Sequence, residues 1–266
     1  MNVMKKKRTS GPKAQPKKNC GGIPTRPVVQ NANTWVAGCD GRMTGSAELA
    51  RVCLVIDLEG FRIPNEWVIR SIKIDGRFID PYLWGPKTTF VVREMGWCPV
   101  ETPSEGDAYQ YDHPMQKYDL PWPVYRSIKY AMRHVHGLAL HPPDLAFVKQ
   151  EECTGNVKRD VWRLYLKYKT DDRPVVGFKG GTLERDLLKE LDIPYLDLEQ
   201  AGCPKFQDMT RLGTMPSCGY HMDAWHHHCA RVECYHFVNW VRTQLGLKAD
   251  LNVVHVERTL RFLSLK

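Results

Sequence analysis

Two carboxylates, Asp57 and Glu59, stand two residues apart in an otherwise apolar segment, Leu-Val-Ile-Asp-Leu-Glu-Gly at 54–60. In a β-strand, side chains alternate between faces, so both carboxylates would lie on the same face. Two like charges about 6–7 Å apart on a buried strand are costly unless a cation lies between them. Carboxylate oxygens favour Mg²⁺ or Mn²⁺, so the pair predicts a divalent-metal site. The alternative is a strand that runs out into solvent and leaves both acids hydrated.

Two later segments place acids where they could complete such a site. A short apolar strand is followed by a Gly-rich turn at 179–181 and a helix, and Glu184 and Asp186 stand in the first turn of that helix. Either acid could add a third carboxylate, although acids at a helix start also stabilise the helix dipole. Near the C-terminal end, His228 precedes Glu233 by five residues, slightly more than one turn of a helix. His228 could then be the general base on a water, with Glu233 as a metal ligand.

The cysteines indicate a second kind of metal site. Four of the nine lie within 32 residues: Cys203, Cys218, Cys229 and Cys234. Cys218 and His221 have the Cys-x₂-His spacing of a zinc knuckle, and Cys229 and Cys203 are the predicted remaining ligands. Thiolate and imidazole together select Zn²⁺ over Mg²⁺. The fourth ligand stays open among Cys203, His228 and a carboxylate, and the alternative is that Cys203 and Cys229 are buried core thiols.

The elements that must position these residues alternate between strands and helices, which predicts an α/β fold with a mixed sheet. Three strands joined by short turns come first, at 51–61, 67–75 and 77–84, and form an antiparallel meander. Residues 85–121 show no clear period and are interpreted as a long excursion with one strand at 88–93. The elements expected after it are a helix from Pro123, a helix at 157–168, a strand at 174–178, a helix capped by Thr182 and running to 191, a strand at 195–198 and a helix at 226–247.

The net charge of +8 is concentrated at the N-terminus. Seven of these charges come from Lys and Arg within the first nineteen residues, which contain no acid, so the rest of the chain is nearly neutral. Such a segment is expected to be disordered, since it has little to bury. It could bind nucleic-acid backbone or act as a nuclear import signal; the alternative is a solubilising tail without a specific partner.

Three regions are therefore expected: a basic tail and lead-in at 1–48, a domain at 49–250 with a zinc-binding insertion at 203–229, and an extension at 251–266. The chain has no run of 18 apolar residues and no apolar stretch after its basic start. We therefore expect no membrane helix and no secretory signal. Nine cysteines without such a signal favour reduced thiols or metal ligands. An intracellular protein, nuclear or cytoplasmic, is the expectation.

Taken together, Asp57-x-Glu59 on the first strand, an acid at the start of a later helix and His-x₄-acid near the end resemble the DEDDh 3′–5′ exonucleases of RNase H-like fold. The resemblance covers about 53–240 and implies a mixed five-stranded sheet with flanking helices. It also implies two-metal hydrolysis of phosphodiester bonds in RNA or DNA, with single strands favoured, and the catalytic residues Asp57, Glu59, Glu184, His228 and Glu233. The family normally has Asp where this chain has Glu184 and Glu233, and Glu is one methylene longer.

A DEDDh-like domain that carries a Glu/Cys/His/Cys zinc site and altered catalytic acids is similar to the Maelstrom domain of small-RNA pathways. That resemblance implies a zinc-stabilised exonuclease-like fold. Two functions follow as expectations. The first is a nuclease that uses Mg²⁺ or Mn²⁺ at Asp57 and Glu59. The second is a catalytically inactive module that binds nucleic acid or a protein partner and is stabilised by structural zinc.

Overall fold

The computed structural model describes residues 46–68, 72–74, 77–111, 120–138, 155–209, 217–221 and 228–248, all of which belong to one compact unit spanning 32–266. For 72–74 and 77–79 only the backbone is described. The predicted extension at 251–266 and all but the last three residues of the predicted tail and lead-in at 1–48 lie outside the described residues. Residues 75 and 76, where the second and third predicted strands are joined, also lie outside them.

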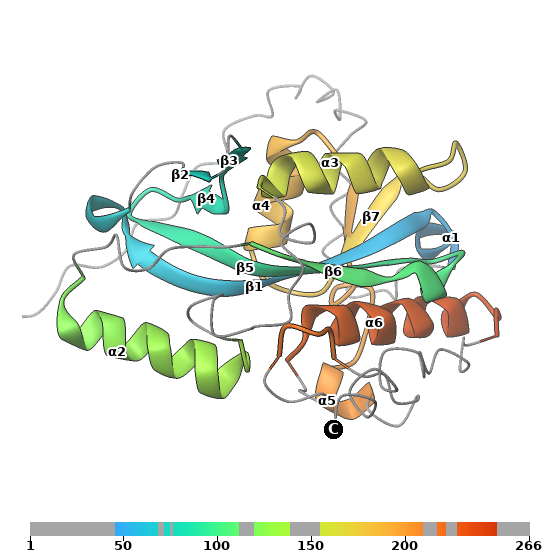
Figure 1. Cartoon of the computed structure of the whole chain (residues 1–266). Helices are drawn as coiled ribbons and strands as arrows, with labels where there is room; N and C mark the ends of the chain where they lie inside the picture. The colour runs from blue at the N-terminus through green and yellow to red at the C-terminus, as the bar shows by residue number, and fades with distance from the viewer. Residues whose placement is uncertain are drawn as a thin grey trace, which may run out of the picture. The chain divides into compact units, whose positions relative to one another are not determined.

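The central element is a mixed sheet with six described strands (Figure 1). They are β1 (Val52–Pro64), β4 (Tyr82–Trp84), β5 (Thr88–Pro99), β6 (Asp107–Gln110), β7 (Val175–Phe178) and β8 (Tyr195–Asp197). The order is β4-β5-β1-β7-β8, and β6 also pairs with β5. The β1–β5 pair is antiparallel, whereas β1–β7 and β7–β8 are parallel. β4 and β6 pair with opposite ends of β5, along the edge that β1 leaves open.

The predicted meander is confirmed only in part, because its second and third strands pair antiparallel as β2 (Ile72–Ile74) and β3 (Arg77–Ile79) but form a sheet of their own rather than joining β1. The third predicted strand, at 77–84, also contains the short strand β4. β1 pairs with β5, whose first half is the strand predicted at 88–93 and whose second half lies in the segment interpreted as irregular. β5 is buried on both faces along nearly its whole length, so its sequence lacks the alternation by which a half-buried strand is found. The sheet therefore has six described strands rather than five.

Five α-helices follow β6 in the described residues, and all except the short α5 lie where a helix was predicted. They are α2 (Trp122–Tyr130), which continues as the π-helix η4 (Ala131–Val135), α3 (Val157–Tyr168), α4 (Leu183–Glu190), α5 (Phe206–Met209) and α6 (Ala230–Gln244). Shorter helical segments are α1 (Ser46–Leu49), η1 (Asn65–Trp67) and η2 (Pro103–Glu105). Thr182 stands at the N-cap of α4, but its side chain makes no capping hydrogen bond. No helix in the described part of the chain is long and apolar enough to cross a membrane.

The two faces of the sheet carry different helices (Figure 1). Leu54, Ile56 and Leu58 of β1 belong to the core cluster that contains side chains of α3 and α4. Val55 belongs instead to the cluster built on α6. Asp57 and Glu59 follow Val55 in the alternation and therefore lie on the α6 face. The two acids thus share one face of the sheet, as predicted, and that face is the one covered by the last helix, α6.

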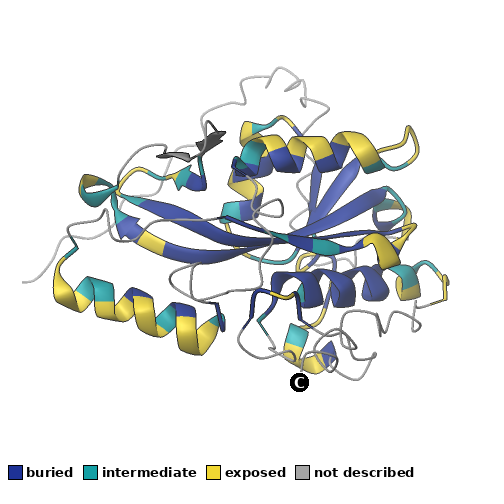
Figure 2. Cartoon of the chain, in the orientation of Figure 1, coloured by how far each residue is buried: buried dark blue, intermediate teal, exposed yellow. Residues whose placement is uncertain are grey.

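Helix α6 is buried along most of its length (Figure 2) and ends at Gln244, three residues before the predicted end at 247. Gly246, two residues beyond the helix, has φ +69°. The Leu247 N–H donates to the Arg242 carbonyl at 2.8 Å and the Gly246 N–H to the Thr243 carbonyl at 3.1 Å, which is the Schellman pattern. The start differs from the prediction of 226–247, because the helix begins at Ala230 with Cys229 as its N-cap.

The start of α6 lies directly against β5 because Gly96 has no side chain. A Cβ at Gly96 would stand 2.1 Å from both the carbonyl carbon and the oxygen of Ala230. We expect Gly96→Ala to lower the free energy of unfolding by about 3 kcal/mol, since backbone must move to relieve the overlap. Urea unfolding followed by circular dichroism measures the change. Gly219→Ala is the control, because nothing lies within 4 Å of its Cβ position; equal losses in both variants would contradict the prediction.

Candidate functional site

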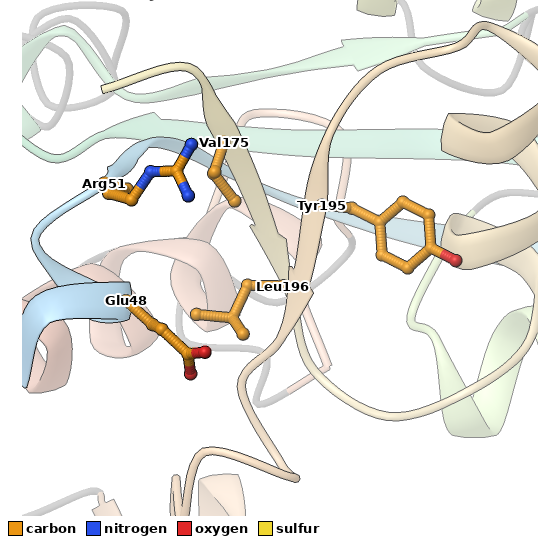
Figure 3. A pocket seen from close by; sticks show the side chains of 5 residues that line it. All are labelled: Glu48, Arg51, Val175, Tyr195 and Leu196. Atoms are coloured by element: carbon orange, nitrogen blue, oxygen red, sulfur yellow. The ribbon is translucent and has the colours of Figure 1, made fainter. Parts of the chain in front are cut away.

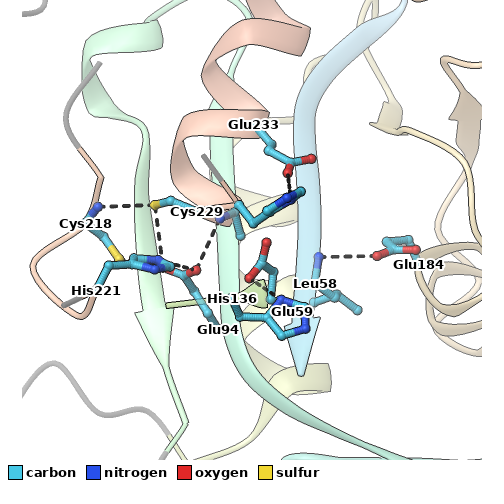
Figure 4. A network of polar contacts seen from close by, with 11 residues as sticks. Leu58, Glu59, Glu94, His136, Glu184, Cys218, His221, Cys229 and Glu233 are labelled. Atoms are coloured by element: carbon cyan, nitrogen blue, oxygen red, sulfur yellow. Dashed lines mark hydrogen bonds and ion pairs between the residues drawn. The ribbon is translucent and has the colours of Figure 1, made fainter. Parts of the chain in front are cut away.

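Four potential metal ligands from three distant segments meet on the α6 face of the sheet (Figure 4). Glu94 comes from β5, Cys218 and His221 from the turn at 217–221, and Cys229 from the N-cap of α6. Their ligand atoms all lie within 4.8 Å of one another, and all four residues are buried. We call this group the buried cluster.

The Glu94 carboxylate is the centre of the buried cluster. Its Oε1 lies 2.5 Å from the Cys218 thiol, and its Oε2 lies 3.0 Å from His221 Nε2. The Ala230 N–H donates to Oε2 at 3.2 Å, and the Cys218 N–H donates to the Cys229 sulfur at 3.2 Å. Two backbone N–H groups thus orient the carboxylate and one thiol toward the centre of the group.

The electrostatics of the buried cluster fit a bound cation. Burial raises the pKa of the Cys218 thiol well above its usual value. Burial alone would also raise the pKa of Cys229, but hydrogen bonds with Cys218 and His221 lower it to about 7. Burial opposes the charge on His221, yet the adjacent Glu94 carboxylate raises the pKa of its imidazole to about 10. Two sulfurs, one imidazole and one carboxylate oxygen, held at this spacing, can hold a metal ion.

Three of the four predicted zinc ligands, Cys218, His221 and Cys229, are brought together here. Cys203 is not, because it packs in the apolar cluster beneath α6, where burial raises its thiol pKa to about 12. Glu94 occupies the position given to Cys203, and a carboxylate was one of the three alternatives left open. In the sequence, Glu94 could have been noticed because it is an acid in the mostly apolar segment 90–98. Asp57 and Glu59 are likewise acids within an apolar segment.

A second group, which we call the acidic site, joins Glu59 of β1 with His228 and Glu233 at the start of α6. The ligand atoms of these three residues lie within 4.8 Å of one another. His228 Nδ1 is 3.5 Å from Glu233 Oε1, and the hydrogen bond with Glu233 raises the pKa of His228. His228 belongs to a turn before the helix and not to the helix itself, so the predicted placement of this histidine inside α6 is wrong.

Sequence reasoning missed one further histidine at the acidic site. His136, which follows η4, places its Nδ1 2.8 Å from Glu59 Oε2 (Figure 4). The two residues are 77 positions apart in the chain, and no local spacing connects them. Only the packing of the α2–η4 segment beside β1 could identify His136.

The other predicted acids, Asp57 and Glu184, stand around the acidic site without belonging to a group of three ligands within 4.8 Å among the described residues. Burial raises the pKa of Asp57 well above its usual value, and the nearby Glu233 and Glu184 carboxylates raise it further. Glu184 Oε1 accepts a hydrogen bond from the Leu58 N–H at 3.2 Å, and burial raises its pKa to about 7. Asp186, the alternative acid, is exposed and pairs with Arg185. Glu184 is therefore the acid of this turn that faces β1.

The buried cluster and the acidic site adjoin one another on the sheet. Glu59 and Glu94 are directly opposite in the β1–β5 ladder, immediately before a register shift that leaves Arg93 as the extra residue of β5. Glu94 and Asp57 both raise the pKa of Glu59, after the larger effect of burial. Like charges directly opposite each other destabilise a sheet, so cations at these positions would relieve repulsion in both groups.

An open hollow of about 270 Å³ borders the acidic site. Its lining includes His228 and Glu233, two lysines (Lys179 and Lys205) and Phe206. Among the described residues neither lysine has an ion-pair partner. Gly180, next to Lys179, has φ +63° and donates its N–H to Asp197 Oδ1 at 3.1 Å, so this turn is held in a conformation that glycine adopts readily.

A smaller pocket lies between α1, β7 and β8 (Figure 3). It is lined by Glu48, Arg51, Val175, Tyr195 and Leu196 and has a volume of about 10 Å³. That volume suffices for at most a single water. The hollow beside the acidic site is therefore the better candidate for a ligand.

Comparisons of the chain with family models, with curated proteins and with solved structures find no match.

Proposed function

We propose that the protein is a metal-dependent nuclease of the 3′–5′ exonuclease type, built on an RNase H-like fold that a structural zinc ion stabilises. The observation that carries the proposal is the convergence of Glu59, His228 and Glu233 within 4.8 Å at a hollow lined by Lys179 and Lys205. A site for divalent cations beside unpaired lysines suits a substrate that carries phosphate.

The side chains in and around the acidic site have separate roles in this proposal. Asp57, Glu59, Glu184 and Glu233 would hold Mg²⁺ or Mn²⁺, because oxygen ligands favour these ions. When bound, the ions stabilise the charge that develops on the phosphoryl oxygens. His228 would take the proton of the water that attacks phosphorus, while the bond from phosphorus to the 3′ oxygen breaks and that oxygen gains a proton. Lys179 and Lys205 would bind the phosphate oxygens.

Zinc at the buried cluster would serve folding rather than chemistry. All four ligand positions are filled by protein side chains, which is typical of structural zinc, whereas catalytic zinc keeps one position open. Glu94, Cys218, His221 and Cys229 are also buried, so a substrate could not reach the ion. The ion would fix the start of α6, from which His228 and Glu233 extend.

A catalytically inactive, zinc-stabilised module that binds nucleic acid or a protein is the second candidate. The observation that favours it is the pairing of acids with histidines, Glu59 with His136 and Glu233 with His228. These pairs partly neutralise the carboxylates without a metal. Under this candidate function the acidic site binds no catalytic metal, and its side chains are held together by these ion pairs.

A nuclease assay distinguishes the two candidates. We expect the purified full chain to shorten 5′-labelled single-stranded RNA or DNA 20-mers from the 3′ end in Mn²⁺ and to produce a ladder. A 3′-terminal phosphorothioate should slow the ladder if degradation starts at that end. Asp57→Ala should abolish shortening, whereas Asp171→Ala, at an exposed position, should not. If no ladder forms, or if Asp57→Ala cleaves as well as the parent, the nuclease proposal fails.

A further inference from the structure

The α2–η4 segment is positively charged throughout. From Leu120 to Leu138 the sequence contains no Asp or Glu, but it contains three cations and two histidines. Among the described residues, none of the three cations Arg126, Lys129 and Arg133 has an ion-pair partner. On α3 the opposite holds, because each Lys and Arg from Lys158 to Lys167 pairs with a carboxylate. Beyond its first nineteen residues the chain is nearly neutral overall, so a helix whose cations have no ion-pair partner among the described residues is a candidate surface for an anion.

Four residues of this segment line up along its outer side. Trp122, Arg126, Lys129 and Arg133 follow one another at spacings of four, three and four residues, which places them on one side of a helix. All four are exposed, and Trp122 is 68% exposed. We call these four residues the basic stripe. It extends about 16 Å along the helix, with its side chains about one turn apart.

Aromatic side chains accompany the cations. Tyr130 is 64% exposed beside the basic stripe, and its ring lies 4.7 Å from that of His134. The opposite side of the helix carries Ile128 and Met132, which are buried against the core cluster that includes Phe61. The apolar residues that attach α2 to the domain are thus separate from its exposed aromatics. Cations interleaved with exposed aromatics match the needs of a single nucleic-acid strand, whose phosphates bind cations and whose bases stack on rings.

The basic stripe leads to the acidic site. Three residues after Arg133 the chain reaches His136, whose Nδ1 lies 2.8 Å from Glu59 Oε2. A strand bound along α2 would therefore have its end near the histidine that contacts Glu59. The charge changes from positive along the helix to negative at the sheet, as a phosphate chain that ends at a metal site requires.

We propose that the basic stripe and Tyr130 bind single-stranded nucleic acid and direct its end toward the acidic site. The direction rests on the proposed function, whereas the binding does not. A duplex is less suitable, because its bases are stacked on one another and cannot stack on Trp122 and Tyr130.

Binding is measured on the full chain carrying Asp57→Asn, which prevents cleavage, by fluorescence anisotropy of a labelled 20-nucleotide strand over a range of salt concentrations. The triple variant Arg126→Gln, Lys129→Gln, Arg133→Gln should bind at least about tenfold more weakly. Its plot of log affinity against log salt should be shallower by about 2, since each lost phosphate contact on a single strand removes about 0.7. Trp122→Leu should bind about fivefold more weakly with an unchanged slope, because it removes stacking and no charge.

The control variant Lys87→Gln, Lys169→Gln, Lys189→Gln removes the same charge from exposed positions on other elements and should change affinity less than about twofold. The basic N-terminus is present in every variant, so it cancels from the differences in slope.

Photo-crosslinking with a 4-thiouridine strand followed by peptide mapping locates the contact. Crosslinks to Trp122 or Tyr130 support the proposal, and crosslinks confined to the N-terminal peptides overturn it.

Equal losses in the triple variant and its control would overturn the proposal. Binding of the parent to vesicles with 30% phosphatidylserine, with oligonucleotide affinity unaffected by the triple variant, would also overturn it in favour of a membrane surface. The two proposals fail separately. If the stripe variants bind weakly but the wild-type chain never shortens a strand, only the nuclease proposal fails. If the stripe variants shorten strands with the same KM as the wild-type chain, only the stripe proposal fails.

Discussion

Glu94→Gln is expected to abolish zinc binding, whereas Cys203→Ala is expected to retain it. Glu94 contacts the other three members of the buried cluster, and a neutral amide in its place removes the anionic ligand. Cys203 lies in the apolar cluster under α6. Elemental analysis of protein never exposed to chelator should give about one equivalent of zinc for the wild type and for Cys203→Ala, but less than about 0.2 for Glu94→Gln.

The same substitution should destabilise the fold, because metal-binding free energy contributes directly to folding. Without the ion, the Cys218 and Cys229 thiols and the His221 imidazole stay buried without the metal that they would share. We expect the free energy of unfolding to fall by about 3–5 kcal/mol for Glu94→Gln, with the loss of amide protection concentrated in α6. Hydrogen exchange measures this. Zinc retained in Glu94→Gln and lost in Cys203→Ala would show that the ligand set is the one first predicted.

Glu233→Gln is expected to lower kcat for strand shortening by at least about 10³-fold while zinc content stays unchanged. Glu233 contributes a carboxylate to the acidic site and lies 3.5 Å from His228. The amide keeps the size of the side chain but removes a metal ligand and the charge that raises the pKa of His228. Losses of this size are typical when a catalytic group is removed.

Two controls make this result specific. Glu190→Gln removes an exposed carboxylate that pairs with Lys158 and should leave kcat unchanged. The wild type and Glu233→Gln should also unfold at similar urea concentrations, because Glu233 does not belong to the buried cluster. Full activity in Glu233→Gln would remove this residue from the catalytic set, and a parallel loss of zinc would show that the two sites cannot be separated.

The parts of the fold that could be predicted are those whose signals are local. α3 occupies 157–168 as predicted, since its apolar residues recur at helical spacing and Asn156 caps its start. Only the first half of β5 was predicted, as a strand at 88–93, because a strand buried on both faces has no alternation that would reveal its full length. The partners of β1 depend on pairing across dozens of residues, and the predicted meander joined neighbours in sequence instead.

The same distinction holds for the sites. Cys218 and His221 were found because a single turn presents both, and Asp57 and Glu59 because one strand does. Glu94 and His136 come to their sites only through long-range packing, which in the case of Glu94 includes the close approach of β5 and α6 at Gly96. No spacing in the sequence encodes such an approach.

The pairing of Glu59 with Glu94 at the middle of the sheet has a consequence for synthesis on the ribosome. Glu94 precedes Cys218 by 124 residues and Cys229 by 135. At about 5–20 residues per second, the central strands are complete roughly 7–27 s before the last ligand has been made. For most of that time the nascent chain carries the two facing carboxylates without the two thiols and the imidazole of the buried cluster. The paired strands β1 and β5 therefore cannot reach their final stability until the start of α6 has left the ribosome.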